Sequence, residues 1–277
     1  MEEKKSKLFV SCQIYGGLGN QLFQIATAMA LAWRFDLEPV FLDKVWVRLG
    51  ERLEYNKTIF RHLTWKDETE FNKIGFKPFN QPSFSFCEIP RFEESTLING
   101  YFQSWRFFED VKERILKDLI YLSDEDQNLV NQSWSQIQKS GIVIAVHVRR
   151  GDTIQNSHYH TLIPLSYYEK AMNYLKEIYK DKVENFTFCV FSDDLEWYKK
   201  ESLFSDCTFW SSGSAYIDLI LMSRCSAFIL GNSTFSWWAA YLSQSEHVLY
   251  PDKWFGPGNS HLDISNLHPP LWKKIEY

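Results

Sequence analysis

Two adjacent arginines at the end of an apolar run are the residues in this chain best placed to bind an anion. Arg149 and Arg150 follow the apolar stretch 142–148, and a glycine and Asp152 come next. Neighbouring guanidinium groups can grip a diphosphate through paired hydrogen bonds. Period-two alternation places His147 on the same face as Arg149. A structural ion pair with Asp152 is the alternative for one arginine, and it leaves the other for a ligand.

Two more polar strings follow apolar runs. Asp193 and Asp194 could accept hydrogen bonds from a ribose hydroxyl or a base N–H, whereas Ser192 or Asp193 could instead cap a helix. The other string begins a helix, where free amides, hydroxyls and the helix dipole attract anions, although capping alone is again an alternative. Its residues are Asn232, Ser233 and Thr234.

A glycine-rich turn lies near the N-terminus. Gly17 and Gly19 stand between an apolar run and a helical pattern. Closely spaced glycines let the backbone approach a ligand and leave amides free at a helix start, although an ordinary tight turn is the alternative. The spacing is not that of GxGxxG, and the lysine of a Walker loop is missing.

The histidines and cysteines do not form a metal-binding pattern. The sequence contains no HExxH or CxxC string, and five cysteines are scattered along the chain. We therefore expect no metal cofactor. The cysteines are interpreted as buried free thiols in a reducing compartment.

Composition excludes several classes of protein. The chain has 277 residues and a formal net charge of −5, without a long run of Lys and Arg, which argues against a nucleic-acid partner. Hydrophobic residues make up 45% and charged residues 23%, as in globular proteins. No apolar stretch reaches the roughly 18 residues of a membrane span. We expect a soluble cytoplasmic protein, with peripheral association at the inner membrane left open.

The elements that position these strings alternate between strands and helices. Strands are predicted at 8–14, 39–42, near 96–102, and at 142–148, 186–191, 207–209, 226–230 and 247–250, the last closing the series. Helices are predicted at 21–34, 107–120, 123–138, 165–180, from about 194, and at 213–224 and 233–243. This alternation is typical of parallel doubly wound α/β sheets. It predicts a boundary between residues 120 and 141 and therefore two domains, 1–140 and 141–277, with a cleft between them. Ligands bind such sheets beyond the carboxyl ends of the strands, where all four strings lie.

The four strings together resemble the α-1,2-fucosyltransferase family, inverting enzymes that use GDP-fucose. They are Gly-Gly-Leu-Gly-Asn-Gln-Leu-Phe-Gln (16–24), His-Val-Arg-Arg-Gly-Asp (147–152), Phe-Ser-Asp-Asp (191–194) and Asn-Ser-Thr-Phe-Ser-Trp-Trp (232–238). The second is similar to the HxRRxD string of a wider fucosyltransferase superfamily. The resemblance implies a GT-B fold with two Rossmann-like domains, the donor in the C-terminal one, the acceptor largely facing the N-terminal one, and no metal. It implies transfer of L-fucose to the 2-hydroxyl of a galactose in an oligosaccharide, as in O-antigen biosynthesis.

The resemblance also implies roles for individual residues. Arg149, with Arg150 beside it, would hold the diphosphate, and Asn232, Ser233 and Thr234 would share that charge. Asp193 or Asp194 would recognise guanine, and His147 would line the nucleoside pocket. The glycines Gly17 and Gly19 would contact the donor, and Asn20 would lie near the reacting sugar.

Three alternatives stay open for the general base. Asp152 is the carboxylate of the HxRRxD string, but it could instead orient the arginines. His160 lies in a loop that should face the cleft, and a phosphate oxygen or water could also take the proton. The α-1,6 relatives place a Glu shortly after the string, whereas 153–163 contains no acid.

Other functions compete with this interpretation. A different GDP-sugar would fit the same phosphate motifs, and a non-catalytic glycan-binding module would suit the aromatic content of 17%. A nicotinamide dehydrogenase is disfavoured because GxGxxG is absent. The irregular region 43–105 is expected to choose the acceptor. The aromatic residues proposed to stack on a sugar are Trp46, Tyr55, Trp65, Phe79, Tyr101 and Trp105, whereas Trp33, Trp237 and Trp238 are expected in the core.

Overall fold

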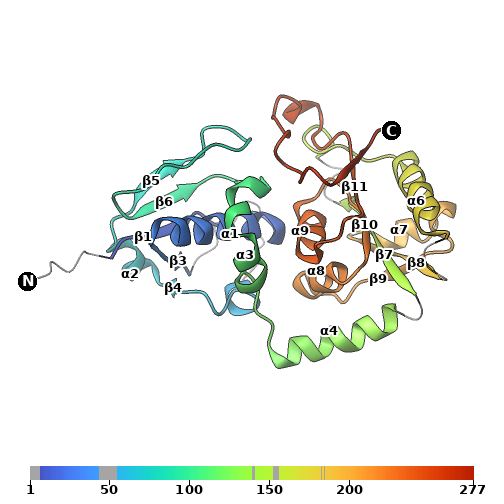
Figure 1. The fold of residues 1–277 in the computed structure, drawn as a ribbon, viewed down its shortest axis with the longest axis horizontal. Helices are drawn as coiled ribbons and strands as arrows, with labels where there is room; N and C mark the ends of the chain where they lie inside the picture. Colours follow the sequence, from blue (N-terminus) through green and yellow to red (C-terminus); the bar gives the residue numbers. More distant parts are fainter. Residues whose placement is uncertain (1–6, 44–54, 139–140, 152–155, 182, 184) are drawn as a thin grey trace, which may run out of the picture. The chain divides into compact units, whose positions relative to one another are not determined.

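A computed structural model describes residues 7–43, 55–138, 141–151, 156–181, 183 and 185–277 (Figure 1). The chain divides into two compact units. The first consists of Met1–Leu122 and Asp263–His268, and the second of Ser123–Leu262 and Pro269–Tyr277. The observed division falls before the helix that follows Ser123, within the region 120–141 where the boundary was expected and earlier than residue 140.

The first unit is built on a parallel sheet with the strand order β2-β1-β6-β5. Its strands are β1 (Phe9–Cys12), β2 (Glu38–Pro39), β5 (Lys77–Asn80) and β6 (Thr96–Asn99). A separate parallel pair joins β3 (Phe41–Leu42) to β4 (Trp65–Lys66). The helical segments are α1 (Leu18–Phe35), η1 (Tyr55–Lys57), α2 (Glu68–Asn72), η2 (Trp105–Phe107), η3 (Glu109–Val111) and α3 (Lys112–Asp118).

Helix α1 begins directly after the glycine turn. Gly17 is extended, with ψ 173°, and no side chain caps the helix start. The helix is rich in alanine and is buried on almost every side up to Ala32, as expected for a helix without a polar face. It ends at Asp36, whose φ of 57° is left-handed and stops the helix. The turn therefore delivers residues 16–20 to the carboxyl end of β1.

The second unit contains a six-stranded parallel sheet with the order β12-β11-β10-β7-β8-β9. The strands are β7 (Ile142–Val148), β8 (Phe186–Ser192), β9 (Thr208–Trp210), β10 (Ala227–Ile229), β11 (Val248–Pro251) and β12 (Lys273–Ile275). Its helical segments are α4 (Asp124–Ile137), α6 (Leu165–Tyr179), α7 (Leu195–Tyr198), η4 (Ser202–Phe204), α8 (Ala215–Ser223), α9 (Thr234–Ser243) and η5 (Pro257–Asn259). Counted along this unit, the strand order is 3-2-1-4-5-6 from β9 to β12, which is the Rossmann order.

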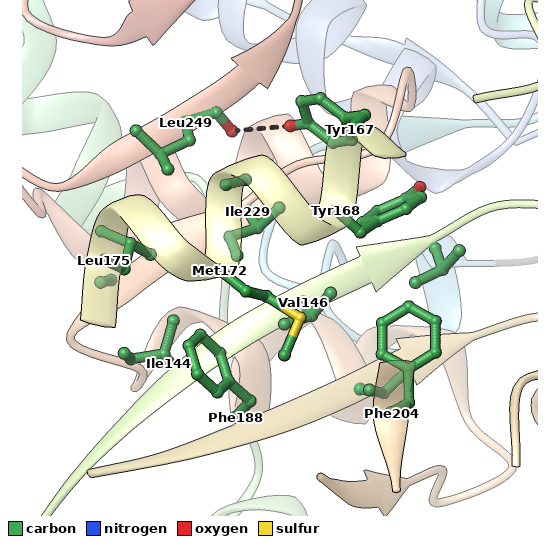
Figure 2. Close-up of a cluster of buried hydrophobic side chains, with 14 of the residues drawn as sticks. Ile144, Val146, Tyr167, Tyr168, Met172, Leu175, Phe188, Phe204, Ile229 and Leu249 are labelled. Carbon is green, nitrogen blue, oxygen red and sulfur yellow. Dashed lines mark hydrogen bonds between the residues drawn. The ribbon is translucent and has the colours of Figure 1, made fainter. Parts of the chain in front are cut away.

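A core cluster joins α6 to this sheet (Figure 2). Met172 packs over Val146 and Phe188, Tyr168 lies toward Phe204 with ring centroids 6.0 Å apart, and these side chains are almost completely buried. The hydroxyl of Tyr167 donates to the carbonyl of Leu230 at 2.7 Å, which satisfies its polar group inside the core. Strand β7 is a continuous apolar run because both faces of a parallel sheet are covered.

The second unit also corrects several element predictions. The series does not close with 247–250, because β12 adds an edge strand from the C-terminus. The helix predicted from about 194 is only the short α7. Helix α4 packs on α8, where Tyr216 donates to Asp126 at 2.9 Å, and so belongs to the second unit.

In the first unit, the helix predicted at 107–120 is shorter. The chain forms the 3₁₀ turns η2 and η3 before α3 begins at Lys112. Of the helices formed by the described residues, none is both long and apolar enough to span a bilayer.

Candidate active site

The sheet of the second unit has its topological switch point between β7 and β10. The chain continues from β7 toward β8 and β9, whereas from β10 it continues toward β11 and β12. In open parallel sheets this reversal opens a crevice at the carboxyl ends of the two central strands. The strings around Arg149 and Asn232 lie at these two ends, as the sequence predicted.

Gly231 lets the ends of β7 and β10 approach each other. A Cβ atom at this position would lie 3.0 Å from the carbonyl oxygen of His147 and 3.1 Å from its Nδ1. The carbonyl belongs to the backbone of β7 and cannot swing aside. A larger residue at position 231 would therefore force the two strand ends apart by a few tenths of an ångström.

Arg149 extends across the switch point. Its Nη1 lies 3.4 Å from the carbonyl oxygen of Asn232, and the side chain is partly exposed. Asn232 is buried, and its Nδ2 donates to the carbonyls of Thr161 at 2.8 Å and Trp254 at 3.1 Å. Its Oδ1 accepts no hydrogen bond from the described residues. Asn232 thus ties two loops to the start of α9 and places a buried acceptor there.

Arg150 is held against the protein instead. Its guanidinium carbon lies 3.9 Å from the ring centroid of Trp197, and its Nε lies 3.5 Å from Oδ2 of Asp194. The Oδ1 of Asp194 accepts from the backbone N–H of Trp197 at 3.3 Å and caps α7. The capping residue is therefore Asp194, and not Ser192 or Asp193 as the sequence suggested. The two arginines have different surroundings, which their adjacent positions in the sequence do not reveal.

Asp193 closes the turn after β7. Its two carboxylate oxygens accept from the backbone N–H groups of Arg150 at 2.9 Å and Gly151 at 3.1 Å. The side chain is exposed, and each oxygen keeps a lone pair for a further donor. Asp193 therefore connects β7 to β8 and remains accessible to a ligand.

His147 is buried beside this turn. Burial lowers its pKa to about 4, the nearby Asp193 carboxylate opposes the shift, and Arg149 adds to it. The imidazole is therefore neutral near pH 7. Its ring centroid lies 5.6 Å from that of Phe235, and its Nδ1 has no hydrogen-bond partner among the described residues.

The start of α9 completes the set. Ser233 is the N-cap, and its Oγ accepts from the N–H of Phe235 at 3.3 Å, so the predicted capping is observed. Thr234 is the first helical residue. The helix dipole gives this end a partial positive charge, on the same side of the sheet as Arg149. Trp237 and Trp238 are fully buried, which confirms their assignment to the core.

Of the two side chains predicted as the general base, the structure describes only His160. Asp152 lies outside the described residues. His160 forms an isolated bridge with Phe255, and its N–H donates to the carbonyl of Asn156 at 3.0 Å. It is partly buried and precedes Thr161, whose carbonyl binds Asn232.

The first unit holds the remaining predicted residues. Gly16 has a φ of +81°, and a Cβ atom there would lie 2.6 Å from Nδ2 of Asn20. Gly17 is exposed and a Cβ atom there would meet nothing within 4 Å, so folding does not require this glycine. Gly19 is buried inside α1. The Oδ1 of Asn20 accepts from Nε2 of Gln103 at 2.8 Å.

Sequence reasoning missed Trp197, Gly231 and Gln103. Trp197 lies one turn after Asp194 on α7, and only its stacking on Arg150 shows its relevance. Gly231 follows β10 and Gln103 lies a few residues beyond β6, so both could have been suspected from their places after the carboxyl ends of strands.

The aromatic residues proposed for acceptor stacking divide by exposure. Tyr55 is buried, which argues against a sugar contact, and Trp46 lies outside the described residues. The rings of Trp65, Phe79, Tyr101 and Trp105 are partly exposed. Tyr101 meets Tyr15 edge to face, with ring centroids 4.9 Å apart. Trp33 is only partly buried and lies 4.0 Å from the guanidinium of Arg114.

The described residues contain no group of three His, Cys, Asp or Glu that could hold a metal ion.

A sequence profile of glycosyl transferase family 11 matches residues 3–253. The chain belongs to this family. This family 11 glycosyltransferase is 29% identical to the O-antigen biosynthesis glycosyltransferase WbnK of Escherichia coli over 90% of this chain and 95% of the relative. It is 28% identical to an α-1,2-colitosyltransferase of Escherichia coli, over 96% of this chain and 99% of the relative.

More distant comparisons extend this result. The family 11 chain is 27% identical to galactoside α-(1,2)-fucosyltransferase 1 of Rattus norvegicus, over 84% of this chain and 63% of the relative. The crystal structure of fucosyltransferase NodZ from Bradyrhizobium aligns with a TM-score of 0.58 and 18% identity, over 85% of this chain and 92% of that one. The predicted GT-B type of α/β fold is thereby confirmed, as is the predicted enzyme class, a glycosyltransferase.

Proposed function

We propose that this enzyme transfers L-fucose from GDP-β-L-fucose to the 2-hydroxyl of a galactose in an oligosaccharide, with inversion at the anomeric carbon. The observation that carries the proposal is Arg149, which reaches across the switch point to Asn232 beside the start of α9. A guanidinium and a helix N-terminus on the same edge suit a nucleoside diphosphate. The α-1,2 linkage and the galactose acceptor are taken from the names of the relatives.

Charge on the leaving diphosphate is the main demand of this reaction. As the bond to the anomeric carbon breaks, negative charge grows on the β-phosphate and the sugar becomes oxocarbenium-like. Arg149 would bind that phosphate, and the hydroxyls of Ser233 and Thr234 would add donors, while the amide of Ser233 already donates to the carbonyl of Gly231. We propose that these groups do the work of a divalent cation, so that transfer needs no metal.

Recognition of guanine is assigned to the carboxylates after β8. A carboxylate can accept from guanine N1–H and the 2-amino group together, a pair that adenine lacks. Asp193 is the better candidate because it is exposed, whereas Asp194 already contacts Arg150 and caps α7. Comparing GDP with ADP affinity in Asp193→Ala and Asp194→Ala tests the role, and unchanged discrimination in both removes it.

Deprotonation of the acceptor hydroxyl is assigned to Asp152, with His160, water or a phosphate oxygen as the other candidates. Asp152→Asn keeps the size of the side chain and removes the base. If this variant keeps near-full kcat with intact GDP binding, Asp152 is not the base, and His160→Asn is the next variant to measure.

A second donor is favoured by one specific comparison. The relative at 28% identity is named a colitosyltransferase, and colitose is fucose without its 3-hydroxyl. The phosphate and guanine contacts would serve both GDP-sugars equally. The choice therefore depends on contacts to the 3-hydroxyl, and competition between the two donors measures it.

The decisive experiment is an acceptor screen. The protein is incubated with GDP-fucose and with lactose, type 1 or type 2 galactosides, and the product linkage is determined. An α-1,2-linked fucose supports the proposal. GDP binding with transfer of another sugar indicates a different donor, and absence of GDP binding favours a glycan-binding module. We propose a cytoplasmic location because buried thiols such as Cys12 and Cys189 suit a reducing compartment.

A further inference from the structure

A strained residue follows the last strand of the first sheet. Phe102 has a φ of +50°, which a bulky residue rarely adopts, and its side chain is fully buried. Its backbone N–H donates to Oε1 of Gln81 at 2.9 Å, and its ring meets Phe107 edge to face. Strain of this kind persists only where surrounding contacts enforce it, and it is concentrated at functional sites.

The residues around Gln103 hold it from both sides. On one side Gln81 holds Phe102. On the other, the N–H of Ser104 donates to the carbonyl of Phe102 at 2.8 Å, and its Oγ donates to the carbonyl of Asn266 at 2.6 Å. Gln103 itself is buried, with 7% of its surface exposed. Its backbone is therefore fixed, and its side chain points in a set direction.

That direction is toward Asn20. Nε2 of Gln103 donates to Oδ1 of Asn20 at 2.8 Å. The carboxamide of Asn20 has an oxygen acceptor on one side and an NH₂ donor on the other. Because Gln103 binds the oxygen, the NH₂ group of Asn20 points away from Gln103. The Nδ2 of Asn20 accordingly lies at the exposed glycine turn, close to Gly16.

We infer that Gln103 is a positioning residue for the transfer reaction, because it makes Asn20 present N–H donors, and not its carbonyl, to an oxygen of the bound substrate. The inference rests on the proposed function and on the role that the family resemblance implies for Asn20, near the reacting sugar. The ligand atom is an acceptor oxygen, which a sugar hydroxyl, ring oxygen or phosphate can supply. Gln103 acts only through Asn20 and does not touch the substrate.

Two substitutions separate positioning from a structural role. Gln103→Met removes the donor at similar size. Gln103→Glu, assayed at pH 8, can only accept, so the amide of Asn20 would turn and present its carbonyl. Both variants are expected to lower kcat at least about tenfold, with little change in KM for the donor. The reason is that misplacing a positioned group by 1 Å can cost up to roughly a hundredfold in rate. The exposed Gln136→Glu on α4 is the matched control and should behave like wild type.

A double-mutant cycle with Asn20→Ala gives the decisive readout. If Gln103 acts through Asn20, Gln103→Met should cost little further activity once Asn20 is alanine. Additive losses, or full activity in Gln103→Glu, would overturn the inference. So would a fall in kcat that merely follows a fall in thermal midpoint across the variants.

The wild-type protein is assayed in parallel with GDP-fucose and GDP-colitose. Absence of fucose transfer by the wild type contradicts the proposed function alone. The ratio of variant to wild-type rates, on the sugar that the wild type transfers, still decides the role of Gln103.

Discussion

The guanidinium of Arg149 reaches from the end of β7 to the carbonyl of Asn232 after β10, across the topological switch point. The guanidinium of Arg150 is instead stacked on Trp197. We expect Arg149→Lys to lower kcat about 100-fold, because an ammonium keeps the charge but loses the planar fork that grips a phosphate. Arg150→Lys should cost much less kcat and act mainly on thermal stability. Steady-state kinetics and thermal unfolding of both variants measure this contrast. Equal kcat losses would show that both arginines contact the diphosphate.

His147 makes stability depend on pH. Its pKa falls from about 6.5 in the unfolded chain to about 4 in the folded protein, because burial disfavours the charged imidazole. Between pH 6.5 and pH 4 the unfolded state binds more protons than the folded state. The folded protein is therefore most stable with respect to His147 above pH 6.5, and it loses this stability as the pH falls toward 4. The linkage amounts to about 2 kcal/mol between pH 8 and pH 5.

Urea unfolding at pH 8 and pH 5 checks this expectation. The wild-type protein should lose about 2 kcal/mol more stability between the two conditions than His147→Gln, which cannot titrate. An equal pH dependence in both proteins would show that His147 does not remain neutral on folding.

At the scale of elements, the approach of β7 and β10 depends on Gly231. Gly231→Ala would place a Cβ atom 3.0 Å from the carbonyl of His147, so the ends of the strands must separate. We expect a loss of about 1–3 kcal/mol in unfolding free energy, as for other overpacked sites, and weaker GDP binding. Gly17→Ala is the contrast, because its Cβ atom meets nothing and the fold should tolerate it. If Gly17→Ala keeps its thermal midpoint but loses activity, the glycine serves a ligand.

At the scale of the whole molecule, the contacts proposed for GDP can be tested in each unit separately. GDP should slow amide hydrogen exchange in the second unit at 145–151 and 230–236. It should do the same at 15–20 in the first unit, because Gly17 and Gly19 are predicted to contact the donor. Peptides from β5 and α4 should not change. Protection confined to the second unit would remove the glycine turn from the nucleotide site.

Local patterns in the sequence predicted the alternation of strands and helices and the polar strings at strand ends. The exact strand 142–148 and the capped helix from Ser123 could be predicted because periodicity and capping depend on neighbouring residues. The added strand β12 could not be predicted, since its three residues are stabilised by pairing with β11. The position of α4 likewise depends on side chains of α8.

The chain order alone therefore determined which residues have suitable chemistry and that they lie at carboxyl ends of parallel strands. Tertiary structure decided that β7 and β10 are neighbours, which brings Arg149 to Asn232 across more than eighty positions. It also gave adjacent arginines different surroundings and directed Gln103 to Asn20. Strand order, stacking and amide orientation arise from contacts between distant segments, and no local pattern encodes those contacts.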